Sequence, residues 1–90
     1  MVWALDYLES AQKSLRKMGK AEADRITKRL GEIAALEEPH TRGHALTGNF
    51  SGLWRYRVDD WRVIARIEKQ RLVILVVEIG HRSKIYRQST

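Results

Sequence analysis

Arginine residues recur through the C-terminal half of the sequence at spacings that could bind a phosphate group. Arg55 and Arg57 are followed by Arg62 and, further on, by Arg82. A guanidinium group presents a planar fork of N–H donors that pairs with phosphate oxygens. Fixed cations also stabilise the charge that develops on the nonbridging oxygens of a reacting phosphodiester. Since arginine stays protonated and cannot act as a general base, we expect clamping, orientation and charge stabilisation from these residues.

Two further residues could transfer protons. His81 carries an imidazole, the side-chain type that titrates near neutral pH, and Tyr86 carries a phenol, so together they could move protons at the 2′ and 5′ oxygens of RNA. Such transfer contributes roughly 10²–10⁴-fold in rate. Other interpretations stay open: His81 as a strand-end residue bonded to backbone, and Tyr86 as a core anchor or a stacking platform for a base.

His40 and His44 are four residues apart, a spacing that suits a metal pair only on a helix with a third ligand nearby. Pro39 and Gly43 argue against a helix there, and no cysteine or aspartate cluster completes a site. Gly43 and Gly48 do not form a phosphate-cradling motif. We therefore predict no metal site and no cofactor.

The arginines belong to a predicted β-hairpin. Residues 53–59 and 61–66 alternate with period two, and Asp59-Asp60 forms the turn between them. When the apolar side chains of both arms share one face, the other face gathers four arginines: Arg55, Arg57, Arg62 and Arg66. Like charges placed opposite one another destabilise a sheet. This conflict indicates a polyanionic partner.

The N-terminal elements are predicted from periodicity and from residues that begin or end helices. Val2–Leu5 is a short apolar strand. Asp6-Tyr7-Leu8-Glu9 matches a capping box, with Asp6 as N-cap, for a helix that ends at Gly19. A second helix, Lys20–Leu36, follows at once and forms an αα-hairpin with the first.

After a loop at His40–Gly52, the hairpin and a strand at Arg71–Ile79 complete the sheet. Regular alternation puts Glu78 on the side of Ile74 and Val76, and Gly80–Tyr86 leaves the sheet. The fold class is therefore α+β in a single domain, residues 1–90. A short N-terminal strand and an α-helical hairpin precede a three-stranded antiparallel meander, and the helices pack on one face of the sheet.

The net charge of +6 is unevenly distributed along the 90 residues. Residues 1–39 carry seven Lys/Arg against seven Asp/Glu, whereas residues 40–90 carry ten against four, and eight of those ten are arginine. Such a basic excess is typical of nucleic-acid binding. The sequence has no cysteine, and its longest apolar run, Leu72–Val77, is too short for a membrane span. We expect no membrane association and a cytoplasmic location.

The residues also carry a family likeness. The hairpin Leu53–Ile64, followed by Glu78-Ile79-Gly80-His81-Arg82 and Tyr86, resembles the RelE branch of the RelE/ParE toxin superfamily. The segment His44-Ala45-Leu46-Thr47-Gly48 is similar to that family's leucine–glycine lead-in to the hairpin. The likeness extends over nearly the whole chain, including the order of elements.

The resemblance implies a microbial-ribonuclease-like fold and the toxin of a type II toxin–antitoxin pair. Such a toxin is an endoribonuclease that cuts mRNA in the ribosomal A site without a metal, leaving a 2′,3′-cyclic phosphate and a 5′-hydroxyl. The implied partners are mRNA on the ribosome, the 16S rRNA around the A site and a cognate acidic RelB-like antitoxin. Family catalytic positions fall on Arg55, Arg57, Arg62, Arg82 and Tyr86.

This sequence departs from the best-known members, which carry lysine at the positions of Arg55 and Arg57. Lysine can lose a proton in a desolvated site and arginine cannot, so a general base would be His81 or Tyr86. The expected roles are phosphate stabilisation by Arg62 and Arg82, action of Tyr86 on the 2′-hydroxyl, auxiliary acid or base catalysis by His81, and RNA binding by Arg55, Arg57 and Arg66.

Two alternatives compete with this interpretation. A ParE-like toxin shares the fold, inhibits DNA gyrase and does not cleave RNA, but that branch generally lacks the full basic-plus-tyrosine set. A nucleic-acid-binding module without catalysis would need the arginines and be indifferent to Tyr86→Phe. An inert structural subunit does not account for the charge asymmetry.

Overall fold

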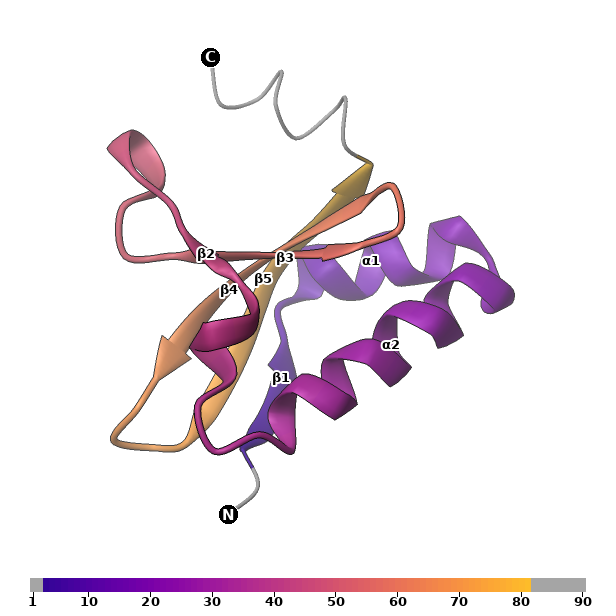
Figure 1. Cartoon of the computed structure of the whole chain (residues 1–90). Coiled ribbons are helices and arrows are strands. Elements are labelled where there is room, and N and C mark those ends of the chain that lie inside the picture. The colour runs from indigo at the N-terminus through magenta and orange to yellow at the C-terminus, as the bar shows by residue number, and fades with distance from the viewer. Residues whose placement is uncertain (1–2, 82–90) are drawn as a thin grey trace.

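The computed structural model describes residues 3–81, in which alternating strand sequences build one mixed sheet. The sheet order is β1-β5-β4-β3-β2, with β1 parallel to β5 and every other pair antiparallel (Figure 1). The strands are β1 (Ala4–Tyr7), β2 (His44–Ala45), β3 (Trp54–Val58), β4 (Trp61–Glu68) and β5 (Val73–His81). The predicted meander of the last three strands is confirmed.

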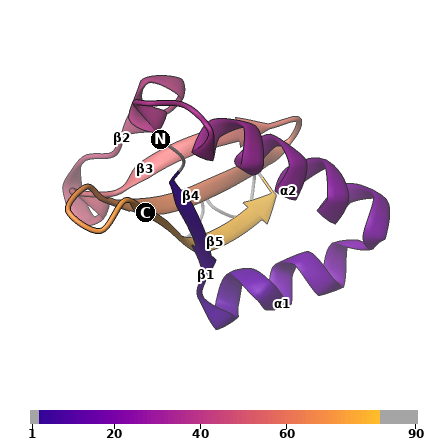
Figure 2. The same ribbon diagram turned by 90° about the horizontal axis from the view of Figure 1, so that it is seen from below.

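Two helices cover one face of this sheet, as predicted. They are α1 (Glu9–Met18) and α2 (Lys20–Ala34), which lie together on the same side in Figure 2. Gly19 joins them with φ of 94°, a backbone conformation that glycine adopts without strain. α1 packs on β5, and α2 packs on β1 and β3. The α+β class is therefore confirmed.

The core lies between the helices and the sheet face that we call the helix face. Strand side chains Tyr56, Val63 and Val76 are at most 1% exposed and pack in one cluster with Ile26 and Leu30 of α2. Burial of a single large aliphatic side chain stabilises a fold by about 1.5–3 kcal/mol. The opposite sheet face, which we call the outer face, faces away from both helices.

The start of the chain corrects two predictions. The first strand is Ala4–Tyr7, not Val2–Leu5, and Val2 lies outside the described residues. Asp6 is therefore a strand residue and does not cap α1. The N-cap is Leu8, which has no side-chain cap hydrogen bond. Pairing of β1 with β5 decides this, because it keeps the chain extended through Tyr7.

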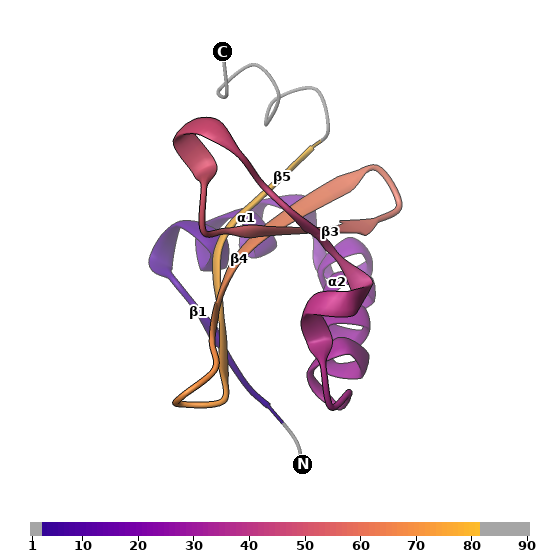
Figure 3. The ribbon, with the colours of Figure 1, turned by 60° about the vertical axis from the view of Figure 1, so that its left-hand side comes forward.

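The segment predicted as a plain loop contains regular structure. Two 3₁₀ turns, η1 (Pro39–Arg42) and η2 (Gly48–Phe50), flank β2, and η1 lies beside α2 in Figure 3. β2 pairs with the start of β3. A two-residue strand carries too little periodicity to be recognised in a sequence rich in turn-forming residues.

A β-bulge in β5 corrects the predicted position of Glu78. Ile64 pairs with Glu78 while the next residue, Ala65, pairs with Val76, so Val77 is an extra residue in β5. Glu78 therefore faces outward with Ile64 rather than inward with Val76. The strand also continues through Gly80 and His81, which were predicted to have left the sheet.

Candidate nucleic-acid interface

The outer face carries the arginines that the sequence predicted to gather there. Arg57 is directly opposite Arg62 in the β3–β4 ladder, and Arg55 is opposite Ile64 on the same face. Arg66 projects from the same face, two residues beyond Ile64 along β4. Like charges on opposing strand positions repel one another. This arrangement concentrates positive charge on one surface of the sheet.

These arginines differ in burial. Arg62 is 4% exposed, Arg55 is half-buried, and Arg57 and Arg66 are exposed. Nη1 of Arg62 donates a hydrogen bond to the backbone oxygen of Trp61 at 3.4 Å. Burial and this hydrogen bond restrict the side chain of Arg62, whereas the exposed arginines can follow a ligand.

A cross-strand row on the outer face also includes residues that were not predicted to belong to the interface. His44 of β2 is opposite Arg55, and Glu78 of β5 is opposite Ile64, so the row runs His44, Arg55, Ile64, Glu78. Ile64 is 3% exposed, yet it lies outside the core cluster between sheet and helices. The row brings an imidazole and a carboxylate to the ends of the arginine surface.

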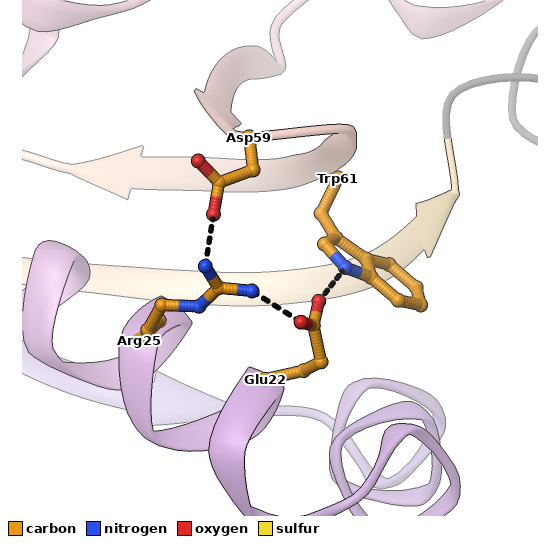
Figure 4. Close-up of polar contacts among 4 residues, drawn as sticks. All are labelled: Glu22, Arg25, Asp59 and Trp61. Atoms are coloured by element: carbon orange, nitrogen blue, oxygen red, sulfur yellow. Dashed lines mark hydrogen bonds and ion pairs between the residues drawn. The ribbon is translucent and has the colours of Figure 1, made fainter.

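His81 is not brought together with the arginines. Its Cα partner is Trp61, and the two rings meet edge to face with centroids 5.7 Å apart. The indole of Trp61 points toward α2, where Nε1 donates to Oε2 of Glu22 at 2.7 Å (Figure 4). His81 therefore lies on the helix face, and its catalytic role stays a prediction that this geometry does not support. Arg82 and Tyr86 lie outside the described residues.

Polar contacts tie the tip of the hairpin to α2 (Figure 4). Arg25 forms an ion pair with Glu22 and another with Asp59, whose Oδ2 lies 3.3 Å from Nη1. The hydrogen bond from Trp61 is the main cause that lowers the pKa of Glu22 below its ordinary value. We call Glu22, Arg25, Asp59 and Trp61 the hairpin clamp. It fixes the turn between the two arginine-bearing strands against a helix, and no sequence pattern pointed to it.

An open cleft of about 300 Å³ lies between α2, η1 and β3. Arg57 reaches this cleft from the sheet, and two arginines that the sequence did not single out also line it, Arg29 and Arg42. Glu32, Ile33, Leu36 and Tyr56 complete the wall. The basic surface therefore continues from the outer face around the edge of β3.

His40 and His44, which are four residues apart in the sequence, lie in separate surroundings. The ring of His40 packs on Trp54 with centroids 5.7 Å apart, and His44 is exposed opposite Arg55. Within residues 3–81, no group of three or more His, Cys, Asp or Glu side chains could hold a metal ion. Across the same residues, no helix is long and apolar enough to cross a membrane.

Comparison with known proteins identifies the class. A family model described as the ParE toxin of type II toxin–antitoxin system, parDE, matches residues 5–86. The mRNA interferase toxin RelE of Escherichia coli (strain K12) is 27% identical over 92 residues, covering 99% of this chain and 95% of that protein. The chain belongs to the ParE toxin family of type II toxin–antitoxin systems, within the RelE/ParE superfamily.

Solved structures share the fold. The toxin–antitoxin complex RelBE2 from Mycobacterium tuberculosis contains a chain with a TM-score of 0.81 at 18% identity, over 91% of this chain and 100% of that one. A mutant of E. coli toxin RelE in the free state has a TM-score of 0.74 at 24% identity, over 97% and 93%. The helices and the mixed sheet described above are therefore those of RelE structures.

Proposed function

We propose that this protein is an endoribonuclease that cuts mRNA on the ribosome and so inhibits translation. The observation that carries the proposal is the outer face, where Arg55, Arg57, Arg62 and Arg66 gather with Arg62 buried among them. Relatives named mRNA interferase, at 27% identity, support the same activity. A bound polyanion would offset the repulsion between Arg57 and Arg62, which are directly opposite one another.

The proposed reaction is attack of the 2′-hydroxyl on the adjacent phosphorus, which gives a 2′,3′-cyclic phosphate and a 5′-hydroxyl. Arg62 and Arg82 stabilise the charge on the nonbridging oxygens. Tyr86 contacts the 2′-hydroxyl through its phenol and orients it for attack. The exposed side chains on the outer face bind the RNA backbone, and no metal ion takes part because the guanidinium groups supply the positive charge.

The proposed setting is the ribosomal A site in the cytoplasm, with the 16S rRNA around it as a second polyanion. We further propose a cognate antitoxin that is acidic and RelB-like. Support comes from solved relatives described as RelBE and RelE–RelB complexes. An acidic partner would neutralise the basic half of the chain, where all of the net charge of +6 resides.

A second candidate function is inhibition of DNA gyrase without RNA cleavage. The observation that favours it is the family description itself, which names ParE. The two functions differ in their products, since a gyrase inhibitor damages DNA and leaves mRNA intact.

The proposal predicts that Arg82→Ala and Tyr86→Phe abolish toxicity while folding stays nearly unchanged. Each removes a group expected to contact the reacting atoms, which costs roughly 10²-fold or more in rate. The measurement is induced expression in bacteria with primer extension on a translated reporter mRNA. Codon-phased cuts should appear for the wild type, and they should vanish in both variants and when the reporter's start codon is removed.

Arg16→Ala is the matched control, because Arg16 is an exposed arginine on α1, on the other side of the sheet. It should arrest growth like the wild type. Growth arrest with DNA damage and no cuts would move the protein to gyrase inhibition. Undiminished arrest in Arg82→Ala, with cuts still present, would remove Arg82 from the reaction.

A further inference from the structure

We propose that His44 is a catalytic residue, the general base that accepts the proton of the 2′-hydroxyl when RNA is cut. This inference rests on the proposed ribonuclease function and names the group that starts the reaction. It is carried by β2, the short strand that sequence periodicity did not reveal.

The register between β2 and β3 decides where His44 lies. Its partner across the ladder is Arg55, and antiparallel partners project from the same face of a sheet. Directly opposite residues have Cβ atoms roughly 4.5–5.5 Å apart. The imidazole therefore stands beside a guanidinium proposed to bind RNA phosphate. His44 is exposed, so an RNA strand on the outer face can reach it.

The contacts around β2 fix it against β3. A Cβ at Gly43 would lie 2.7 Å from the backbone oxygen of Arg55 and 2.9 Å from Cε1 of Tyr56, so only glycine permits this approach without displacement. Directly after the C-terminal end of β2, the backbone N–H of Leu46 donates a hydrogen bond to the backbone oxygen of Leu53 at 2.9 Å. The imidazole is therefore presented from a fixed strand, as positioned catalytic groups are.

Within residues 3–81, the other candidates for the base are less well placed. Arginine cannot accept the proton, and His81 lies on the helix face against Trp61. Glu78 is on the outer face at the far end of the same row, but it is half-buried, whereas His44 is exposed. Among residues 3–81, His44 is the histidine that shares a sheet face with the arginines.

In the proposed step, the imidazole of His44 takes the proton from the 2′-hydroxyl while the 2′ oxygen forms a bond to phosphorus. The bond from phosphorus to the 5′ oxygen breaks, and that oxygen takes a proton from solvent water. His44 then returns its proton to solvent. No oxidant, reductant or metal is needed, because cleavage to the cyclic phosphate only moves a proton from one oxygen to another.

The experiment measures single-turnover cleavage of mRNA on purified ribosomes by His44→Gln and His44→Ala. The rate should fall about 100-fold in both variants, within the range for loss of a general base. Added imidazole should restore cleavage by His44→Ala and leave the wild type unchanged. His40→Gln is the matched control, since that ring packs on Trp54 and lies outside the cross-strand row of His44 and Arg55, and it should cleave at the wild-type rate.

Two readouts separate a base from a structural or acidic role. The rise of the cleavage rate with pH should disappear in His44→Gln. The charged groups that share the outer face with His44 remain unchanged in this variant: Arg55, Arg57, Arg62, Arg66 and Glu78. An mRNA with sulfur in place of the 5′ oxygen has a leaving group that needs no proton. His44→Gln should remain slow on it, and recovery there would overturn the assignment as base.

The failure of this inference differs from the failure of the proposed function. A wild type that cuts no mRNA on ribosomes would refute the ribonuclease itself. Cleavage by the wild type together with an equal rate for His44→Gln would refute the role of His44 alone. A larger loss for His81→Gln or Glu78→Gln than for His44→Gln would likewise overturn it and identify the base.

Discussion

Tyr56 joins two parts of the chain through one buried side chain. It is 1% exposed, and its hydroxyl donates to the backbone oxygen of Pro39 at 2.9 Å. Burial raises the pKa of Tyr56 from 10.0 to about 12. The phenol thus holds η1 against β3 and helps to place β2. Tyr56, which has no predicted role in function, thereby positions His44, the proposed general base.

Tyr56→Phe should lower the free energy of unfolding by about 1–2 kcal/mol at neutral pH, because the buried oxygen of Pro39 loses its donor. The raised pKa stabilises the wild type below pH 10.0, and this contribution is lost as the pH rises toward about 12. The difference between the two proteins should therefore shrink in that range. Urea unfolding at several alkaline pH values measures it, and a constant difference would contradict the account.

At the scale of elements, the hairpin and α2 act as one unit through the hairpin clamp. Trp61 begins β4, one residue before Arg62, and its indole is bonded to Glu22 on α2. The turn residue Asp59, with φ of 54°, is held by Arg25. Exposed ion pairs contribute little individually, but here they connect a strand end, a turn and a helix. The clamp therefore fixes the angle at which the arginine-bearing strands leave the helix layer.

Trp61→Phe keeps a ring but removes the N–H donor to Glu22, so it should destabilise the protein at pH 7. The pKa of Glu22 is lowered in the folded state, so its contribution is present above the ordinary glutamate pKa of roughly 4.3 and is lost as the pH falls further. The loss of stability should therefore be smaller at pH 3 than at pH 7.

Urea unfolding of both proteins at the two pH values tests this, with Glu22→Gln added to both. The two substitutions should be non-additive, since Trp61→Phe removes the donor of this hydrogen bond and Glu22→Gln replaces its charged acceptor by a neutral one. Trp54→Phe, which changes a tryptophan packed on His40, should show no such dependence on acid pH. Full additivity of Trp61→Phe and Glu22→Gln would exclude the clamp.

At the scale of the whole molecule, the N-terminal half provides support and the C-terminal half provides charge. Residues 1–39 are balanced in charge and supply both helices, while residues 40–90 carry the basic excess, which includes the arginines of β3 and β4. A surface with this distribution attracts polyanions from a distance and orients them toward one face. The cleft lined by Arg29 and Arg42 extends that surface beyond the sheet.

This distribution predicts the salt dependence of binding to a single-stranded RNA oligonucleotide. Arg57→Gln removes an exposed cation of the outer face, so the slope of log affinity against log salt should fall by about 0.7, the value for one phosphate contact on a single strand. Fluorescence anisotropy across a KCl series measures the slope. Arg16→Gln on α1 should leave the slope unchanged, and equal slopes for all three proteins would contradict the assignment of the face.

How far the sequence could predict this molecule depended on the length of each pattern. The arms of the hairpin are long enough for period two to assign the faces of Arg55, Arg57 and Arg62 correctly. β2 has only two residues, so the sequence predicts a loop at His44. The clamp joins residues far apart in the chain, which no local pattern encodes. Face assignment failed at Glu78, because a bulge breaks the alternation on which it depended.

That bulge has a genetic consequence. Val77 is the supernumerary residue of β5, so loss of its codon would leave the ladder pairing on both sides intact: Ile64 with Glu78, and Ala65 with Val76. A one-codon deletion within a central strand ordinarily turns every later side chain to the wrong face. Here it would straighten the strand and forfeit the hydrogen bond that Ser10 donates to the Val77 oxygen at 2.7 Å. The gene can therefore lose the codon for Val77, within a central strand, without exchanging the two faces of the residues that follow.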